Sequence, residues 1–191
     1  MRRARDRAPV IGDLVPAEAG AVEELASLVT RFDHVAVAVR DLATAAPLYA
    51  DLFGGRLIAG GDDDRLAIRS LQLSFPPGVK IELLQPLHEQ SYLAAYLEKR
   101  GPGFHHMTCF VEDVTEAAAR LEAAGYSTVD TRTGTGCWDE TFIRPSSAFG
   151  TLVQLTDSPL SWTDPVMPEG AGIGDVLAGR IAWNDARPAW R

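Results

Sequence analysis

The stretch FDHVAVAV (residues 32–39) and its counterpart GFHHMTCFV (residues 103–111) decide the fold of this chain. In each stretch apolar residues occupy alternate positions after a histidine, His34 in the first and His106 in the second. Alternation with a period of two is typical of a β-strand that buries one face. Two strands that begin in the same way indicate that the chain contains an internal repeat.

An offset of 72 residues aligns the two halves of the chain, and it carries His34 onto His106 and Glu82 onto Gln154. The same offset joins further pairs of identical residues: Val39 and Val111, Asp41 and Asp113, Ala45 and Ala117, Ala46 and Ala118, Gly78 and Gly150, and Leu83 and Leu155. Each half is predicted to hold a strand, a helix and then two or three further strands. We therefore expect two βαβββ modules and an α+β fold.

The predicted modules divide the chain into five segments. Module 1 covers residues 32–88, module 2 covers residues 105–157, and a linking helix and turn over residues 89–104 join them. Residues 1–31 are predicted to be an N-terminal extension with a short helix between Val22 and Val29. The remaining residues, 158–191, form a tail outside the repeat.

The tail holds three of the four tryptophans of the chain. It is rich in Gly and Pro, and its one helical pattern is a weak one near residues 176–182. Tryptophans in such a segment are typical of docking, because a large ring with a polar N–H finds its best surroundings at an interface. The tail is predicted to dock either onto the body of the chain or onto a second subunit.

The two helices of the modules differ in how clearly they begin. In module 2, Asp113 is a good N-cap and Gly125 is a natural end to the helix. In module 1, Pro47 would interrupt a helix that begins after Asp41. Two alternatives follow: Thr44 caps a later start with Pro47 in the first turn, or the helix bends at Pro47.

The bulk composition excludes several classes of protein. The net charge is −8, from 18 Lys and Arg against 26 Asp and Glu, which disfavours a nucleic-acid partner. No apolar run approaches the roughly 18 residues that span a bilayer, and no apolar segment follows the basic start, so we expect no membrane partner and a cytoplasmic location. Cys109 and Cys137 form no CxxC pair and are expected to be reduced thiols.

The repeat also predicts a site. Equivalent positions of two modules related by a pseudo-twofold axis lie close together, so we expect His34, Glu82, His106 and Gln154 around one centre. Two imidazoles, a carboxylate and an amide oxygen suit one divalent ion of Mn, Fe, Co, Ni or Zn better than Ca or Mg. His105 is expected to point away from His106, because neighbouring residues of a strand face opposite sides.

Four segments of the sequence resemble the vicinal oxygen chelate superfamily. They are DHVAVAVRDL (33–42), KIELLQPL (80–87), LEKRGPGFHHM (97–107) and RPSSAFGTLVQL (144–155). Within the superfamily the chain is most similar to methylmalonyl-CoA epimerases, and glyoxalases are more distant. The resemblance spans residues 32–157, and it implies paired βαβββ modules that form a cup-shaped mixed sheet around a divalent metal. It also implies a homodimer.

Carried over by position, His34, Glu82 and His106 match metal ligands of the epimerases. Gln154 matches a fourth ligand that is a glutamate in epimerases, where it also acts as a base. An amide oxygen can bind a metal but cannot take a proton near neutral pH, so the usual base of module 2 is missing.

The missing base suggests a reversed arrangement of catalytic groups. Epimerases have a second glutamate on the penultimate strand of module 1, which falls here within residues 69–73, where there is no acid. With the modules exchanged, the two positions become Glu82 and Glu140, and we predict these two as the catalytic pair. The alternative is that Glu140, or its neighbour Asp139, is a solvated acid at a strand end.

The sequence thus predicts a metal-dependent epimerase, isomerase or lyase that removes a proton next to a metal-bound carbonyl. Its substrate would be a small molecule, an acyl-CoA or a 2-oxo compound. One alternative is an Fe(II) dioxygenase of the same superfamily, although the order of the ligands along the chain differs from that of the family. Another is a non-catalytic protein of the antibiotic-sequestering type that binds a small molecule without metal.

Overall fold

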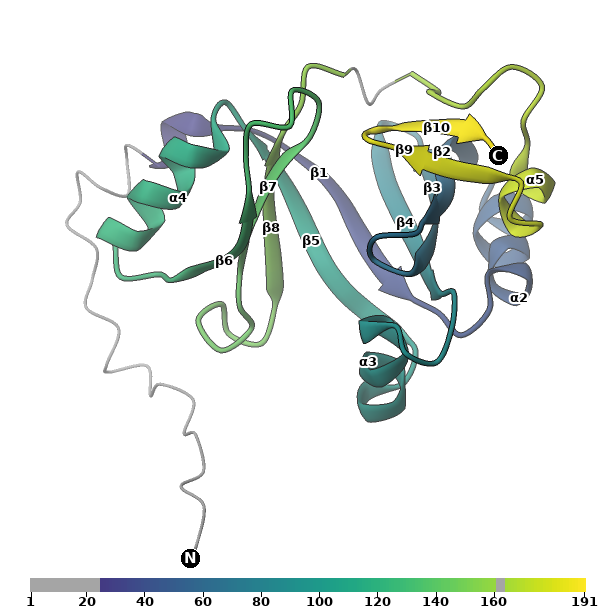
Figure 1. Cartoon of the computed structure of the whole chain (residues 1–191), viewed down its shortest axis with the longest axis horizontal. Coiled ribbons are helices and arrows are strands. Elements are labelled where there is room, and N and C mark those ends of the chain that lie inside the picture. Colours follow the sequence, from purple (N-terminus) through teal and green to yellow (C-terminus); the bar gives the residue numbers. More distant parts are fainter. Residues whose placement is uncertain (1–24, 161–163) are drawn as a thin grey trace, which may run out of the picture. The chain divides into compact units, whose positions relative to one another are not determined.

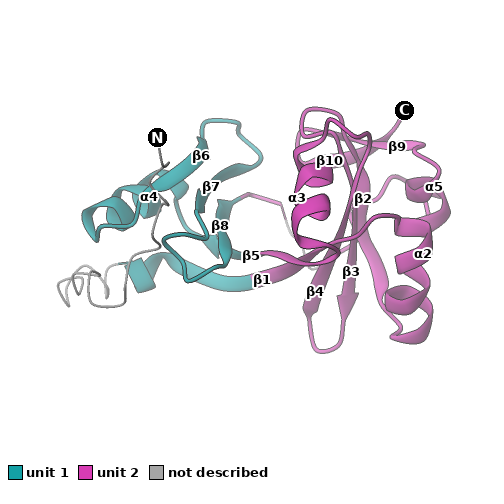
Figure 2. Ribbon diagram, turned by 90° about the horizontal axis from the view of Figure 1, so that it is seen from below, with its two compact units in different colours: residues 1–32, 107–157 teal, residues 33–106, 158–191 magenta. Residues whose placement is uncertain are grey.

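The computed structural model describes residues 25–160 and 164–191. It divides into two compact units, shown in Figure 2. Of the described residues, unit 1 contains 25–32 and 107–157, and unit 2 contains 33–106, 158–160 and 164–191. The strands β1 (Val29–Ala38) and β5 (Gly103–Val111) each contribute residues to both units. Compact units and sequence modules therefore divide the chain differently.

Unit 2 contains most of the strands (Figure 1). Beside β1 and β5 these are β2 (Arg56–Asp63), β3 (Ile68–Phe75), β4 (Val79–Pro86), β9 (Ile181–Asn184) and β10 (Arg187–Trp190). They are arranged in the order β10-β9-β2-β3-β4-β1-β5. β1 runs parallel to β4 and β9 runs parallel to β2, whereas β2, β3 and β4 pair antiparallel. The sheet is mixed, as expected.

Helices cover both faces of this sheet. On one face lie α2 (Leu42–Ala46), the π-helical turn η2 (Pro47–Leu52) and α5 (Ile173–Leu177), which pack on Leu71, Leu73 and Leu83. On the other face α3 (Tyr92–Arg100) packs through Leu93 and Leu97 onto Ala36, Ala38 and Leu84. No helix in the described ranges is long and apolar enough to cross a bilayer.

Unit 1 contains the rest of the second module. Its strands follow the order β5-β8-β7-β6, with β6 at Thr128–Arg132, β7 at Asp139–Ile143 and β8 at Leu152–Asp157. The helix α4 (Val114–Ala123) buries Val114, Ala117 and Leu121 against Val111 and Leu155. In chain order the strands and helices give two βαβββ modules, which confirms the expected α+β fold.

The helix ends agree with the signals in the sequence. Asp113 caps α4, because its carboxylate accepts the N–H of Glu116 at 2.8 Å. Asp41 caps α2 in the same way, accepting the N–H of Thr44 at 2.9 Å. The helix therefore begins after Asp41 and changes to a wider π-helical turn at Pro47, where the N–H needed for the regular hydrogen bond is absent. The later start at Thr44 was wrong.

The predicted short helix between Val22 and Val29 falls partly outside the described residues. Residues 25–28 form a helical turn that leads directly into β1. Residues 22–24 are not described, so the rest of this prediction stays a prediction.

The tail is more ordered than its composition predicted. Instead of one weak helix near residues 176–182, it forms α5 and the strands β9 and β10, and β9 lies beside β2. Two glycines of β2 allow this approach: a Cβ atom on Gly61 would lie 3.2 Å from Cγ2 of Ile181, and one on Gly60 would lie 3.2 Å from Cγ1 of Val176. Within the described residues, the tail therefore docks onto the body of the chain.

Ion pairs to a buried carboxylate hold the tail in place. Asp62 on β2 is 5% exposed, and its carboxylate accepts hydrogen bonds from Arg69 and from Arg191 of the tail. Arg69 also donates to the carbonyl oxygen of Leu177 at the end of α5. Arg191 has a second, exposed partner in Asp64. Asp62 is thus the common acceptor that joins β2, β3 and the tail.

We expect Asp62→Asn to lower the free energy of unfolding by about 3 kcal/mol, because it removes the charge that two arginines share. Urea unfolding measures this loss, and limited proteolysis should cut the tail faster. Asp64→Asn is the matched control, since Asp64 contacts Arg191 in solvent and should cost less than about 1 kcal/mol. Equal losses in the two variants would contradict the role given to Asp62.

Candidate metal centre

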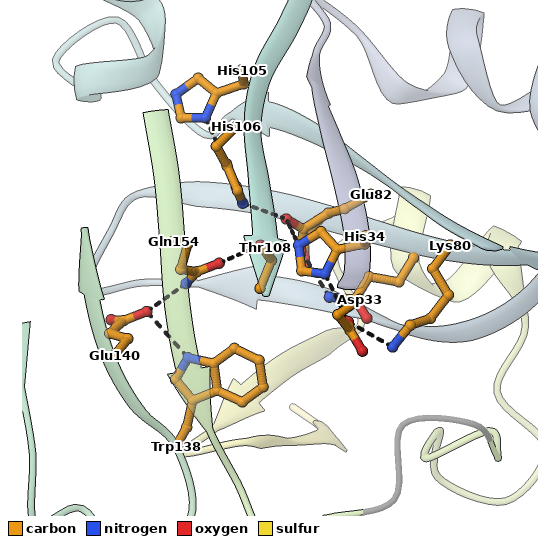
Figure 3. A network of polar contacts seen from close by, with 12 residues as sticks. Asp33, His34, Lys80, Glu82, His105, His106, Thr108, Trp138, Glu140 and Gln154 are labelled. Atoms are coloured by element: carbon orange, nitrogen blue, oxygen red, sulfur yellow. Dashed lines mark hydrogen bonds and ion pairs between the residues drawn. The ribbon is translucent and has the colours of Figure 1, made fainter. Parts of the chain in front are cut away.

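Three side chains that the sequence predicted as ligands lie together in unit 2 (Figure 3). They come from three neighbouring strands: His34 from β1, Glu82 from β4 and His106 from β5. Their ligand atoms all lie within 4.8 Å of one another. Oε2 of Glu82 is 3.5 Å from Nε2 of His34 and 3.8 Å from Nε2 of His106. All three side chains are buried, so two imidazole nitrogens and one carboxylate oxygen share a small interior space.

The register of β1 and β4 explains how this space arises. The parallel pairing sets Ala36 opposite Glu82 and His34 opposite Lys80. Alternation then puts the side chains of His34, Ala36, Lys80 and Glu82 on one face of the sheet. Because Ala36 is small, the longer side chain of Glu82 can extend toward His34 without a steric clash.

Neighbouring side chains hold His34 and Glu82 in these positions. Oδ2 of Asp33 lies 2.9 Å from Nδ1 of His34 and 2.7 Å from Nζ of Lys80. The amide of Gln72 donates through Nε2 to Oε1 of Glu82 at 3.0 Å. These contacts engage Nδ1 of His34 and Oε1 of Glu82. The remaining atoms of the two groups, Nε2 of His34 and Oε2 of Glu82, face each other.

Gln72 did not emerge from the sequence. It lies on β3 directly opposite Glu82 in the antiparallel register with β4, and it is 4% exposed. Its signal was present, because a glutamine between two leucines in LQL (residues 71–73) is unusual in a buried strand. The strand register, which connects it to Glu82, was needed to interpret that signal.

The prediction for His105 was wrong. Its Nδ1 atom lies 2.8 Å from Nδ1 of His106, and the ring centroids are 5.1 Å apart. Alternation fixes the direction of each Cβ atom, but Nδ1 is bonded to Cγ and stays close to the backbone, so the two rings can still turn toward each other. The rings of Tyr92 and Tyr96 on α3 pack against His105, with centroids 6.0 and 4.8 Å away.

The three candidate ligands have very different proton affinities. Burial alone would lower the pKa of His34, but its hydrogen bonds with Asp33 and Glu82 raise it to about 9. Burial would raise the pKa of Glu82, but the contact with His34 lowers it to about 2. Burial lowers the pKa of His106 to about 3, and the charge of Glu82 does not offset this. At neutral pH without metal, His34 is therefore the charged imidazolium with a proton on both nitrogens, His106 is the neutral imidazole and Glu82 is ionised.

The donor set fits a divalent transition metal. Two imidazole nitrogens and one carboxylate oxygen, presented from three strands, are the ligands that Mn, Fe, Co, Ni and Zn accept. Three protein ligands also leave positions open for a substrate. The shell is too poor in oxygen for Ca or Mg. The residues present are therefore suited to the predicted ion.

The other two predicted residues, Gln154 and Glu140, form a hydrogen-bonded chain within unit 1 (Figure 3). Oε1 of Gln154 accepts from the hydroxyl of Thr108 at 2.7 Å, and its Nε2 donates to Oε2 of Glu140 at 2.8 Å. Nε1 of Trp138 donates to the same oxygen at 3.1 Å. The parts of Gln154 and Glu140 in metal binding and catalysis stay predictions.

The alternative that Glu140 is a solvated acid at a strand end is wrong. Glu140 is 7% exposed and accepts two hydrogen bonds from side chains. Its neighbour Asp139 instead closes a loop, since its carboxylate accepts the N–H groups of Gly134 and Thr135. The two adjacent acids therefore have different surroundings, and Glu140 is the one held in a buried polar network.

We expect zinc binding near pH 7.5 to release about one proton, because a ligating imidazole must be neutral and His34 carries a second proton below about pH 9. Calorimetry in buffers of different ionisation enthalpy measures the release. Lys99→Ala, on the exposed side of α3, is the control and should release the same number. Binding without proton release would contradict a protonated His34.

Comparisons with known proteins show the family to which the chain belongs. Residues 33–142 match the model of the Glyoxalase/Bleomycin resistance protein/Dioxygenase superfamily. The chain is 35% identical over 132 residues to ethylmalonyl-CoA/methylmalonyl-CoA epimerase of Cereibacter sphaeroides, a match that covers 67% of this chain and 98% of that protein.

Two solved structures extend the comparison. The crystal structure of methylmalonyl-CoA epimerase from Mycobacterium tuberculosis is 37% identical, with a TM-score of 0.64, and the match covers 70% of this chain and 91% of that one. A Streptomyces coelicolor methylmalonyl-CoA epimerase in complex with 2-nitronate-propionyl-CoA is 27% identical, with a TM-score of 0.61, covering 69% and 99%. The resemblance seen in the sequence is confirmed, and the chain belongs to the Glyoxalase/Bleomycin resistance protein/Dioxygenase superfamily.

Proposed function

We propose that this protein is a divalent-metal-dependent epimerase. It would remove a proton from the carbon next to the carbonyl of an acyl-CoA and return a proton to the opposite face of that carbon. The observation that carries the proposal is the buried group of His34, Glu82 and His106. The similarity to methylmalonyl-CoA epimerases supports the acyl-CoA substrate. A 2-oxo compound, as used by glyoxalase-like enzymes, is the other substrate class with a suitable carbonyl.

In this proposal the residues of unit 2 bind the ion. His34 and His106 offer Nε2, and Glu82 offers Oε2 while Gln72 holds its other oxygen. A bound divalent ion would supply Lewis-acid character, which polarises the substrate carbonyl and makes the adjacent C–H bond more acidic. Gln154 is the proposed fourth ligand, through its amide oxygen.

Two carboxylates are proposed to carry the proton. Glu140 is the proposed base, because Trp138 and Gln154 both donate to its Oε2 and so fix the orientation of the carboxylate. Glu82 is proposed to be the second proton carrier as well as a ligand, and because it is ionised it would first take up from solvent the proton that it returns to the carbon. Its contact with His34 keeps its pKa low, so it is a weaker base than an ordinary carboxylate. We therefore assign the first proton transfer to Glu140.

One observation favours a second candidate function. Two histidines and one carboxylate also form the triad of Fe(II) dioxygenases. Such an enzyme would require iron and oxygen, whereas the epimerase requires neither. A protein that binds a small molecule without metal would leave the buried polar groups of unit 2 unexplained.

Elemental analysis should find about one divalent ion for each chain of the untagged protein. His34→Ala should lose it, because the substitution removes one of the three ligands in the buried group. His88→Ala is the control, since His88 lies outside the group of ligands and the variant should keep the metal. Iron would favour the dioxygenase, and failure to take up any metal on reconstitution would contradict both enzymes.

Glu140→Gln should slow exchange of the proton at carbon 2 of methylmalonyl-CoA with deuterated solvent by about 10³, a typical contribution of a general base. The metal content should not change. Asp139→Asn is the neighbouring control, and its exchange rate should stay within about tenfold of the wild type. If both variants exchange at the wild-type rate, Glu140 is not the base.

A further inference from the structure

The residue before each histidine ligand makes the same contact in both modules. Oδ2 of Asp33 lies 2.9 Å from Nδ1 of His34, and Nδ1 of His105 lies 2.8 Å from Nδ1 of His106. The offset of 72 residues that aligns the two halves carries Asp33 onto His105. Equivalent positions thus provide a carboxylate in one module and an imidazole in the other.

The chemistry of a ligating imidazole explains why this contact matters. A neutral imidazole has one nitrogen with a proton and one with a free lone pair. Nε2 of His34 and of His106 faces Glu82, so a metal would bind there, and the proton of each ring would lie on Nδ1. An acceptor beside Nδ1 fixes this tautomer and the orientation of the ring.

His105 can accept this hydrogen bond in only one of its two neutral tautomers. Nδ1 of His106 and Nδ1 of His105 are at hydrogen-bond distance, so just one of them carries the shared proton. If His106 donates from Nδ1, then His105 accepts through the lone pair of its own Nδ1. The proton of His105 must then be on Nε2. The two neighbouring histidines are therefore linked in one order of tautomers.

Separate groups hold each acceptor in place. Asp33 is fixed by Nζ of Lys80 at 2.7 Å. His105 is fixed by Tyr92 and Tyr96, which follow each other by four residues along α3 and present their rings to it. The linking helix between the modules, which the repeat leaves outside both, thereby supports His105.

We propose that Asp33 and His105 are positioning residues that set the tautomers of the metal ligands His34 and His106. This inference rests on the proposed metal site and adds the tautomer of each histidine ligand. One ligand has a charged acceptor, which strengthens it as a donor to the metal, and the other has a neutral acceptor, which strengthens it less. The two histidine ligands are therefore unequal.

Zinc affinity of two variants at residue 105 tests the proposal. In His105→Asn the side-chain oxygen lies near the place of Nδ1 and can accept the proton, whereas in His105→Leu no acceptor remains. We expect His105→Leu to bind zinc about 10- to 100-fold more weakly than the wild type in competition with a chelator. His105→Asn should stay within about threefold. Equal losses in the two variants, or no loss in either, would overturn the proposal.

A second measurement uses the wild-type protein and does not depend on the folding of a variant. Nitrogen-15 NMR of the zinc-loaded protein should show His106 with its proton on Nδ1 and His105 with its proton on Nε2. A proton on Nδ1 of His105 would overturn the proposal. A wild-type protein that takes up no zinc would contradict the proposed function itself. Zinc binding of equal affinity in the wild type and in both variants at residue 105 would contradict only this inference.

Discussion

The buried carboxylate of Glu82 is the constraint on which the arrangement of unit 2 depends. A charge in a protein interior costs several kcal/mol unless partners surround it. Here β1 supplies His34, β3 supplies Gln72 and β5 supplies His106. These partners are available only if all three strands lie close to β4. The mixed sheet with β1 between β4 and β5 provides that arrangement.

In each unit a glutamate and a glutamine pair across the last two strands of the module. The glutamate is on the last strand in unit 2 and on the strand before it in unit 1. In unit 2 Gln72 on β3 donates to Glu82 on β4, and in unit 1 Gln154 on β8 donates to Glu140 on β7. In both pairs a neutral amide donates to the carboxyl group. Each pair therefore contains one acid where two glutamates would place two, which avoids the repulsion between neighbouring carboxylates.

The sequence was most informative where a signal was local and repeated. The strands of the two modules, the cap at Asp113, and the meeting of His34, Glu82 and His106 followed from alternation, from the spacing of capping residues and from one offset. It was least informative about contacts between distant segments, such as β9 with β2 and Gln72 with Glu82. Those contacts depend on strand register and on close approach at glycines, which composition does not reveal.

The error at His105 has a different origin, because alternation describes backbone directions and not the reach of a ring. An imidazole can turn its Nδ1 atom along the strand, whereas an aliphatic side chain has no polar atom to place there. Patterns of hydrophobicity are therefore reliable for the core residues of β5 and less so for its two adjacent histidines.

The strand β10 affects whether a β-strand of another molecule can pair with the sheet of unit 2. It is the last strand of its sheet, so one of its sides offers unpaired backbone groups. Pro188 has no N–H to offer at that edge, and Arg187 places a charge beside it. Because of these two residues, another β-strand pairs poorly with the edge that β10 forms. The tail also covers the longer strand β2, which without β9 would be the exposed edge.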